Sequence, residues 1–358
     1  ILEANNEDIE KAREKGTDEG LIDRLRLTDE RVRSIAQAVR DVVSLPAPVG
    51  EIVEGRRLPH GIPLTQMRVP MGVIGAIYEA RPNVTVDIAV LALKSGNASV
   101  LRGGSLAQSS NTVLISLLRD ALVTAGLPEN SINGIDKWGR EGARVLMNAR
   151  EYVDLLIPRG GSELIQTVVM NSTVPVIETG VGNVHMFIDA SATVRTTTKL
   201  VVNSKAQRPS VCNALETLLV HEKAARRVLP RILEGLNDAN VVIHGDPTVA
   251  AYAPDGVKVQ RATRKDWNKE YLDLEIAIKV VEDIEAAIEH IREYSSGHTD
   301  VIVTNDLSNA ELFVSTIDSA SVGVNVSTRF TDGGAFGLGA EVGISTQKLH
   351  ARGPMGLT

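Results

Sequence analysis

The sequence contains almost no cysteine. Cys212 is the only one among 358 residues, so the chain has no internal disulfide and no multi-cysteine zinc site. Aromatic residues are also scarce, at 3% of the chain, which argues against the base-stacking surfaces of single-strand-binding proteins. The formal net charge of −7 gives no basic field that would attract nucleic acid. The composition therefore predicts no nucleic-acid partner.

Long apolar runs and an apolar leader are missing as well. No run approaches the roughly 18 residues that span a bilayer, and no signal-peptide pattern opens the chain. We therefore expect no membrane partner and a cytoplasmic location. The chain begins at Ile1 instead of methionine, from which we expect a fragment of a longer product.

The remaining composition is that of a globular α/β protein. Hydrophobic residues make up 43% of the 358 residues, enough for two domains that each have a core. Apolar β-rich runs alternate with segments of helical period, which predicts parallel sheets covered by helices. We expect strands at 69–78, 98–102, 153–157 and 174–178, helices at 84–94, 105–125, 141–149 and 162–170, then strands at 215–220, 257–259, 276–281 and 301–304, with a helix around 284–291.

Cys212 lies in a polar turn just before the apolar run that starts at Ala214. Two interpretations are open. Free cysteine is often a small buried hydrophobe. At a strand entrance, four residues after Arg208, cationic groups and backbone N–H groups can instead stabilise a thiolate nucleophile.

Two glycine pairs follow predicted strands and open helices. They are Gly103-Gly104, before Ser105, and Gly160-Gly161, before Ser162. Helix N-termini bind phosphate through unsatisfied N–H groups and a positive dipole end, although such a pair is usually only a turn. The common G-x-G-x-x-G dinucleotide fingerprint is absent.

Several motifs together resemble one family. The resemblance is carried by residues 78–85 (YEARPNVT), 101–104, 157–161, 207–213 (QRPSVCN), 327–334 and 347–357. These runs closely resemble the γ-glutamyl phosphate reductases, which are glutamate-5-semialdehyde dehydrogenases of the aldehyde dehydrogenase superfamily. The resemblance extends from one end of the chain to the other.

The resemblance implies an aldehyde dehydrogenase-like fold with two α/β domains. A cofactor-binding domain is expected at 1–203, with 330–358 returning to it, and a catalytic domain at 204–329. A hairpin at about 52–70 is expected to serve homo-oligomerisation. Family members usually begin upstream of Ile1 and continue past Leu357, so we expect missing segments at both ends.

The resemblance also implies an activity. It is the NADPH-dependent reduction of L-glutamyl 5-phosphate to L-glutamate 5-semialdehyde and phosphate, the second step of proline biosynthesis from glutamate. Functional coupling to glutamate 5-kinase follows. Cys212 is expected to form a thioester, and Asn83 to stabilise the oxyanion. The alternative for Asn83 is a helix N-cap.

Cofactor contacts are implied residue by residue. Arg102 and Ser105 match positions at the adenine ribose, where an arginine without a nearby glutamate accepts a 2′-phosphate and therefore favours NADPH. Ser162 matches a pyrophosphate contact, and Glu270 matches the glutamate that binds the nicotinamide ribose. Glu270 is otherwise an ordinary solvated charge on a surface strand. The complete expected set is Arg102, Gly103, Gly104, Ser105, Gly160, Gly161, Ser162 and Glu270.

The implied substrate has a carboxylate and a phosphate, so its pocket needs cations. Arg208 and Arg329 are the candidates, with Arg81 and Arg159 as further options. Each is alternatively part of a structural ion pair.

The role of Glu178 stays open. It matches the general base of hydrolytic aldehyde dehydrogenases, but a reaction that releases an aldehyde needs no such base; a structural carboxylate and a minor cofactor contact are the alternatives. His185 and His350 are interpreted as lone core or surface histidines, and no metal is expected. The competing functions are an inactive α/β scaffold and a CoA-acylating or hydrolytic aldehyde dehydrogenase.

Overall fold

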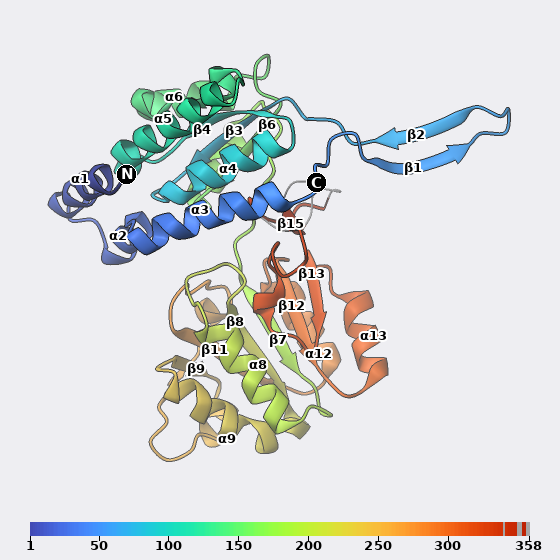
Figure 1. Ribbon diagram of the computed structural model, residues 1–358. Helices are drawn as coiled ribbons and strands as arrows, with labels where there is room; N and C mark the ends of the chain where they lie inside the picture. Colours follow the sequence, from blue (N-terminus) through green and yellow to red (C-terminus); the bar gives the residue numbers. More distant parts are fainter. Residues whose placement is uncertain (339–340, 349–352, 356–358) are drawn as a thin grey trace. The chain divides into compact units, whose positions relative to one another are not determined.

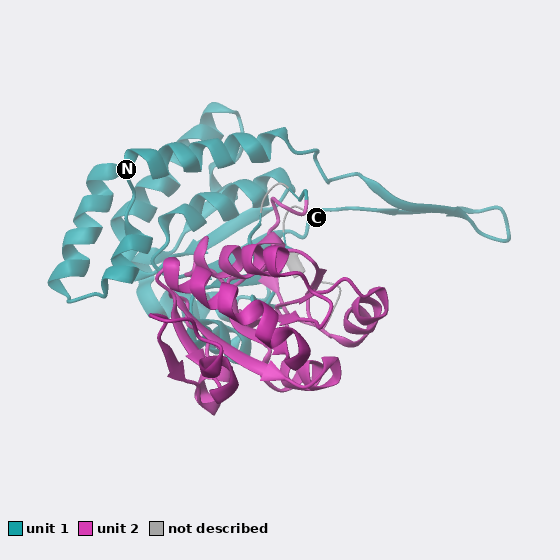
Figure 2. Cartoon of the chain, turned by 90° about the horizontal axis from the view of Figure 1, so that it is seen from below, with its two compact units in different colours: residues 1–179, 337–343, 355–358 teal, residues 180–336, 344–354 magenta. Residues whose placement is uncertain are grey.

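The computed structural model describes residues 1–338, 341–348 and 353–355. It divides into two compact units, drawn in different colours in Figure 2. Unit 1 comprises residues 1–179, 337–343 and 355–358, and unit 2 comprises 180–336 and 344–354. Of the returning segment predicted at 330–358, residues 339–340, 349–352 and 356–358 lie outside the described residues.

Unit 1 contains a four-stranded sheet in the order β5-β4-β3-β6, with every pairing parallel. Residues 74–78 of its strand β3 are all buried, as expected for a strand covered on both faces. The elements are α1 (Leu2–Glu14), α2 (Glu19–Leu25), α3 (Asp29–Ser44), β1 (Ile52–Arg57), β2 (Pro63–Met67), β3 (Val73–Tyr78), α4 (Pro82–Lys94), β4 (Ala98–Arg102), the 3₁₀ turn η1 (Ser105–Ala107), α5 (Gln108–Thr124), η2 (Glu129–Ser131), β5 (Ile132–Gly134), η3 (Asp136–Trp138), α6 (Gly139–Met147), β6 (Leu155–Arg159) and α7 (Ser162–Asn171).

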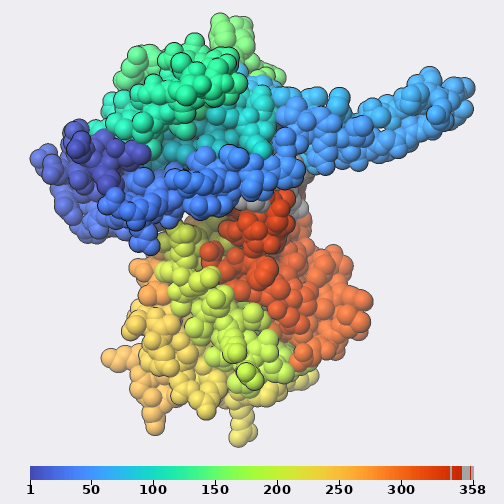
Figure 3. All heavy atoms as spheres, viewed as in Figure 1, coloured from blue at the N-terminus to red at the C-terminus, as the bar shows by residue number. Residues whose placement is uncertain are grey.

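Strands β1 and β2 form the hairpin that the sequence predicts. They pair antiparallel, and all their residues are exposed. The hairpin extends away from the sheet and helices of unit 1 (Figure 1), and in Figure 3 it is a thin blue arm. Its role in assembly stays a prediction.

Unit 2 contains a seven-stranded sheet in the order β10-β9-β11-β8-β7-β12-β13, and its pairings are parallel. Strand β8 lies at its centre and is buried along its whole length. The elements are β7 (Val184–Ile188), α8 (Val194–Ala206), β8 (Leu215–His221), α9 (Glu222–Asp238), β9 (Val242–Gly245), α10 (Pro247–Ala251), β10 (Val259–Arg261), α11 (Arg264–Trp267), β11 (Glu275–Val281), α12 (Ile284–Tyr294), β12 (Thr299–Val303), α13 (Leu307–Thr316), β13 (Ser321–Val324) and η4 (Thr328–Phe330); the short strands β14 (Gly343–Ser345) and β15 (Gly353–Met355) follow.

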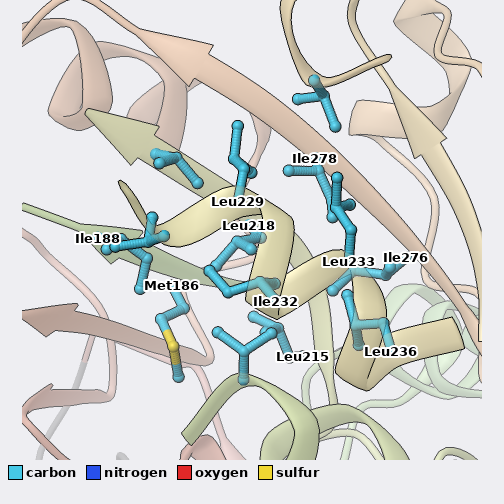
Figure 4. Packing of buried hydrophobic residues seen from close by; sticks show 14 of the residues in the cluster. Met186, Ile188, Leu215, Leu218, Leu229, Ile232, Leu233, Leu236, Ile276 and Ile278 are labelled. Carbon is cyan, nitrogen blue, oxygen red and sulfur yellow. The ribbon is translucent and has the colours of Figure 1, made fainter. Parts of the chain in front are cut away.

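The largest core cluster of unit 2 lies between α9 and this sheet. Leu229 and Ile232 of α9 meet Leu218 of β8 and Ile278 of β11, as Figure 4 shows. All four side chains are fully buried. Burying a side chain of this size contributes about 1.5–3 kcal/mol, so this layer fixes the central strand that follows the Cys212 turn.

The strand predicted at 174–178 is wrong: the structure has only an isolated bridge between Leu156 and Val176 there, because Pro175 has no N–H to continue a ladder.

The two compact units divide at 179/180, and the domain boundary expected after residue 203 stays a prediction. The units divide there because β7 pairs with β8 and β12 inside the seven-stranded sheet.

Candidate active site

Cys212 lies in a tight turn at the amino end of the central strand of unit 2. The N–H of Ala214 donates to the carbonyl of Val211 at 3.0 Å, so Cys212 and Asn213 are the two middle residues of the turn. The cysteine is half-buried, and β8 begins at Leu215. The structure therefore places the thiol at a strand entrance, as the sequence predicts, and not in the hydrophobic core.

The backbone of Gly182 lies directly against this turn. A Cβ atom at position 182 would overlap the Cys212 carbonyl oxygen, so only glycine permits this approach. The N–H of Gly182 also donates to Oε1 of Glu270 at 2.8 Å. Unit 2 thus brings Glu270 close to the cysteine turn. Glu270 is half-buried in the loop between α11 and β11, and it does not lie on a surface strand.

A second loop, residues 327–331, is connected to both sides of the turn. The amide of Asn213 donates to the carbonyl of Thr331 at 2.8 Å. Nε of Arg329 donates to Oε1 of Gln207 at 3.2 Å, five residues before Cys212. Arg329 is therefore near the cysteine turn, whereas Arg208 is exposed on the turn's approach.

A buried ion pair supports the same region. Nζ of Lys205 lies 2.7 Å from Oε2 of Glu216, and neither side chain is exposed. Oε1 of Glu216 accepts the N–H of Leu272 at 3.4 Å, two residues after Glu270. Burial raises the pKa of Glu216 and lowers that of Lys205, while their contact opposes both shifts. The pair connects the end of α8, the start of β8 and the Glu270 loop.

In unit 1, Asn83 is the second residue of α4. The N-cap is Arg81 and Pro82 occupies N1, so the cap interpretation of Asn83 is wrong. Its Nδ2 donates to Oδ2 of Asp87 at 2.9 Å, one helical turn later. Burial raises the pKa of Asp87, while the bond from Asn83 and the nearby Arg159 oppose that shift. Because local sequence does not mark a helical aspartate as special, Asp87 was not among the predicted residues.

The first glycine pair is held by protein carboxylates. Gly103 donates its N–H to Oδ1 of Asp136 at 2.6 Å, and a Cβ there would overlap Nδ2 of Asn111. Gly104 is the N-cap of η1, where Ser105 is exposed. Nε of Arg102 donates to the carbonyl of Gly139 at 3.2 Å. Because the N–H of Gly103 is already bonded, an anion at this loop would bind side chains such as those of Arg102 and Ser105.

The second glycine pair begins α7 at the surface. Gly160, Gly161 and Ser162 are exposed, and Gly161 is the N-cap of the helix. Its N–H donates to Oε2 of Glu79 at 2.9 Å. The N-terminus of α7 thus binds a carboxylate. Like a phosphate oxygen, this group is negatively charged, as the positive end of a helix dipole favours.

The remaining predicted residues have ordinary surroundings. Glu178 is half-buried and accepts a bond from Nε2 of Gln166 at 3.3 Å. His185 is fully buried, while His350 lies outside the described residues. Among residues 1–338, 341–348 and 353–355, no three His, Cys, Asp or Glu side chains gather as a metal site. No helix in that part of the chain is long and apolar enough to cross a membrane.

Comparisons with known proteins decide the family. The sequence profile of the aldehyde dehydrogenase family matches residues 19–253. The γ-glutamyl phosphate reductase of Kineococcus radiotolerans is 56% identical over 358 residues, which cover all of this chain and 83% of that protein. The chain belongs to the γ-glutamyl phosphate reductase family. It is therefore an oxidoreductase, with a nicotinamide cofactor implied by the aldehyde dehydrogenase family.

Solved structures agree on the fold. The crystal structure of γ-glutamyl phosphate reductase from Thermotoga maritima has a TM-score of 0.95 and 51% identity, covering 99% of this chain and 85% of that one. An acetylating aldehyde dehydrogenase from Geobacillus thermoglucosidasius has a TM-score of 0.68 at 18% identity, covering 99% and 95% of the two chains. The predicted aldehyde dehydrogenase-like α/β fold is thereby confirmed. The roles of the individual site residues stay predictions.

Proposed function

We propose that this γ-glutamyl phosphate reductase family member reduces L-glutamyl 5-phosphate to L-glutamate 5-semialdehyde with NADPH, through a thioester on Cys212. The relatives' name supports the substrate, at 52–57% identity over essentially the whole chain. The observation that carries the mechanism is the Cys212 turn, held between the Gly182–Glu270 contact and the 327–331 loop. The product places the reaction at the second step of proline biosynthesis from glutamate.

The cysteine performs the acyl transfer. Its thiolate attacks the acyl carbon, the bond between that carbon and the phosphate oxygen breaks, and phosphate leaves with the electron pair. A bound reduced nicotinamide supplies the hydride that converts the thioester to the aldehyde oxidation level. When the carbon–sulfur bond then breaks, the thiolate of Cys212 is restored and the aldehyde leaves.

Asn83 supplies a donor for the negative oxygen in this mechanism. An amide nitrogen has two hydrogens, and the contact with Asp87 uses one. The other is the proposed oxyanion donor. Asp87 fixes the amide orientation, since a carboxylate accepts hydrogen bonds and therefore selects the NH₂ end of Asn83.

Each unit contains residues that are proposed contacts of a dinucleotide. The N–H of Gly161 at the N-terminus of α7 donates to the Glu79 carboxylate, which a pyrophosphate oxygen would replace; Gly160, Gly161 and Ser162 are the proposed contacts. Glu270 is the proposed ligand of the nicotinamide ribose, and Gly182 orients its carboxylate. Arg102, Gly103, Gly104 and Ser105 are proposed to shape the adenosine end.

Arg329 and Arg208 are the proposed partners of the substrate's anionic groups. Arg329 is half-buried near the cysteine turn, which gives it a stronger charge-assisted interaction than a fully solvated cation.

Assembly through the hairpin and functional coupling to glutamate 5-kinase are further parts of this proposal.

The thioester is tested with Cys212→Ser. A serine hydroxyl without an adjacent base is a much weaker nucleophile, so turnover should fall at least about a thousandfold while NADPH binding is kept. The assay is phosphate-dependent reduction of NADP⁺ by glutamate 5-semialdehyde, with simple aldehydes as the comparison substrates. A Cys212→Ser enzyme that retains a substantial share of wild-type kcat contradicts the covalent mechanism.

A further inference from the structure

A polar groove of about 540 Å³ lies between α1 and the start of α5 in unit 1. Ser105, the residue proposed at the adenine ribose, lines this groove together with Lys11 and Lys15. Arg102 does not line it, and its Nε donates instead to the carbonyl of Gly139. The cations that share a groove with Ser105 are therefore Lys11 of α1 and Lys15, the C-cap of that helix.

Several backbone donors near the groove are already bonded. Asp8 accepts the N–H groups of Ser109 and Ser110 at 3.0 and 2.8 Å, and its carboxylate is buried. The N–H of Gly103 donates to Asp136. With these N–H groups taken, the side chains of Lys11, Lys15 and Ser105 are donors that an anion in the groove could use.

The register of the two helices places both lysines along the groove. Nζ of Lys11 donates to Oγ of Ser109 at 3.3 Å. Asn5, earlier in α1, donates to Oγ of Ser110, later in α5, so α1 runs opposite to α5. Lys15 lies about one turn beyond Lys11, on the side toward Ser105.

The groove holds two ammonium groups, of Lys11 and Lys15, and two carboxylates, of Glu7 and Asp8. Lys11 has one carboxylate neighbour, Glu7 at 3.7 Å, and both side chains are about 60% exposed. Such exposed pairs are weak, so a phosphate with up to two charges competes successfully for the ammonium group. The Asp8 carboxylate is already occupied by hydrogen bonds from Ser109 and Ser110.

We infer that Lys11, Lys15 and the hydroxyl of Ser105 form the binding site for the 2′-phosphate of NADPH. The inference rests on the proposed function, because it assumes that the adenosine end of the cofactor lies at Ser105. NADH has a hydroxyl in place of this phosphate and gains nothing from the two ammonium groups. Lys11 and Lys15 consequently set the preference between the two cofactors.

Lys11→Ala/Lys15→Ala is the decisive variant. A hydrogen bond to a charged group changes affinity by about tenfold, so the double variant should raise KM for NADPH by roughly 10- to 100-fold. KM for NADH and kcat with either cofactor should change less than about twofold. Lys258→Ala, at an exposed lysine of unit 2, is the control and should affect both cofactors equally little.

Ligand binding separates this inference from the proposed reaction. Calorimetry with adenosine 2′,5′-bisphosphate and with AMP needs no turnover. Tighter binding of the bisphosphate by the wild type, lost in the double variant, supports the site even if L-glutamyl 5-phosphate is not the substrate. Equal wild-type affinities for the two nucleotides, or equal losses for NADPH and NADH, overturn it. An inactive wild-type enzyme with intact bisphosphate discrimination overturns only the proposed function.

Discussion

Asp87 gives Asn83 a fixed orientation within α4. Nδ2 of Asn83 donates to Oδ2 of Asp87 at 2.9 Å, which orients the amide. If Asp87 positions Asn83, mutation of the two residues should give a different result than if Asp87 only stabilises the helix. If Asp87 acts through Asn83, removing both residues should cost no more than removing Asn83 alone, because coupled residues are not additive.

Asp87→Ala should therefore lower kcat about tenfold and leave KM for the substrate nearly unchanged. Asn83→Ala should lower kcat by about two orders of magnitude, the loss typical of one oxyanion donor. Asp87→Asn, whose amide oxygen still accepts the bond, should retain most activity. Steady-state kinetics of the two alanine variants and of their combination measure the coupling. Fully additive losses contradict the positioning role.

Between elements, the Lys205–Glu216 pair joins α8 to β8 with no exposed charge. Removing one partner leaves the other charge buried and unpaired, which costs about 3–5 kcal/mol. Lys205→Met should lower the free energy of unfolding by that amount in urea titrations. Lys205→Met/Glu216→Leu should recover most of the loss, since an apolar pair of similar volume is often neutral.

An exposed pair in the same unit provides the control. Arg231 and Glu234 are 2.6 Å apart, with side chains 69% and 46% exposed. Arg231→Met should cost less than about 1 kcal/mol. A Lys205→Met loss no larger than this would show that the buried pair is not a stabilising link.

Strands β4 and β7 show which elements could be predicted from the sequence and which could not. The strand predicted at 98–102 is confirmed as β4 (Ala98–Arg102). A short β-rich run that ends at a Gly-Gly pair is typical of a buried strand. Strand β7 was not predicted, since His185 interrupts its apolar run. That histidine is nevertheless buried, and its N–H donates to Asp300 from 115 residues away.

Part of the candidate site could be predicted from the sequence, and part could not. Cys212 and the two glycine pairs were identified from local sequence. The carboxylates on the glycine N–H groups were not, because Asp136 is 33 residues from Gly103 and Glu79 is 82 residues from Gly161. Likewise, the approach of Gly182 to Cys212 depends on the pairing of β7 with β8. Such contacts follow from tertiary packing, which no local pattern encodes.

For the whole molecule, the hairpin makes assembly testable. Ile52 and Met67 face each other across its strands, and they are 60% and 54% exposed. Exposed apolar side chains on an extended arm are typical of a contact with another chain. Ile52→Asp/Met67→Asp should reduce the oligomer mass in light scattering. Gln66→Asp, on the opposite face of β2, should leave it unchanged.

Three buried histidines of unit 2 should each lower the stability of the molecule in acid. Burial lowers the pKa of His185 to about 4, of His290 to about 3 and of His298 to about 4. Their value in the unfolded chain is about 6.5. Between these values the unfolded state binds more protons, so stability is present above about pH 6.5 and is lost as the pH falls.

Asp300 opposes this trend. Burial raises its pKa to about 6, so between about pH 6 and 4 the folded state holds the extra proton and gains stability as the pH falls. At pH 5 each histidine costs roughly 2 kcal/mol, and Asp300 returns roughly 1.4 kcal/mol. Glu216, whose pKa burial raises to about 7, acts in the same direction as Asp300, as do Asp87 and Asp136, whose pKa values burial also raises. The histidine contribution is therefore tested on a single group.

His290→Phe isolates one of these groups. The ring of His290 packs 4.6 Å from Tyr294 and 5.5 Å from Trp267, between ring centroids, and phenylalanine keeps an aromatic ring in that place. The difference in unfolding free energy between pH 7 and pH 5, measured in urea, should shrink by about 2 kcal/mol relative to the wild type. His60→Gln, at an exposed histidine in the turn of the hairpin, should leave the difference unchanged. An equal pH dependence in His290→Phe and the wild type would show that protonation of His290 does not drive the acid loss.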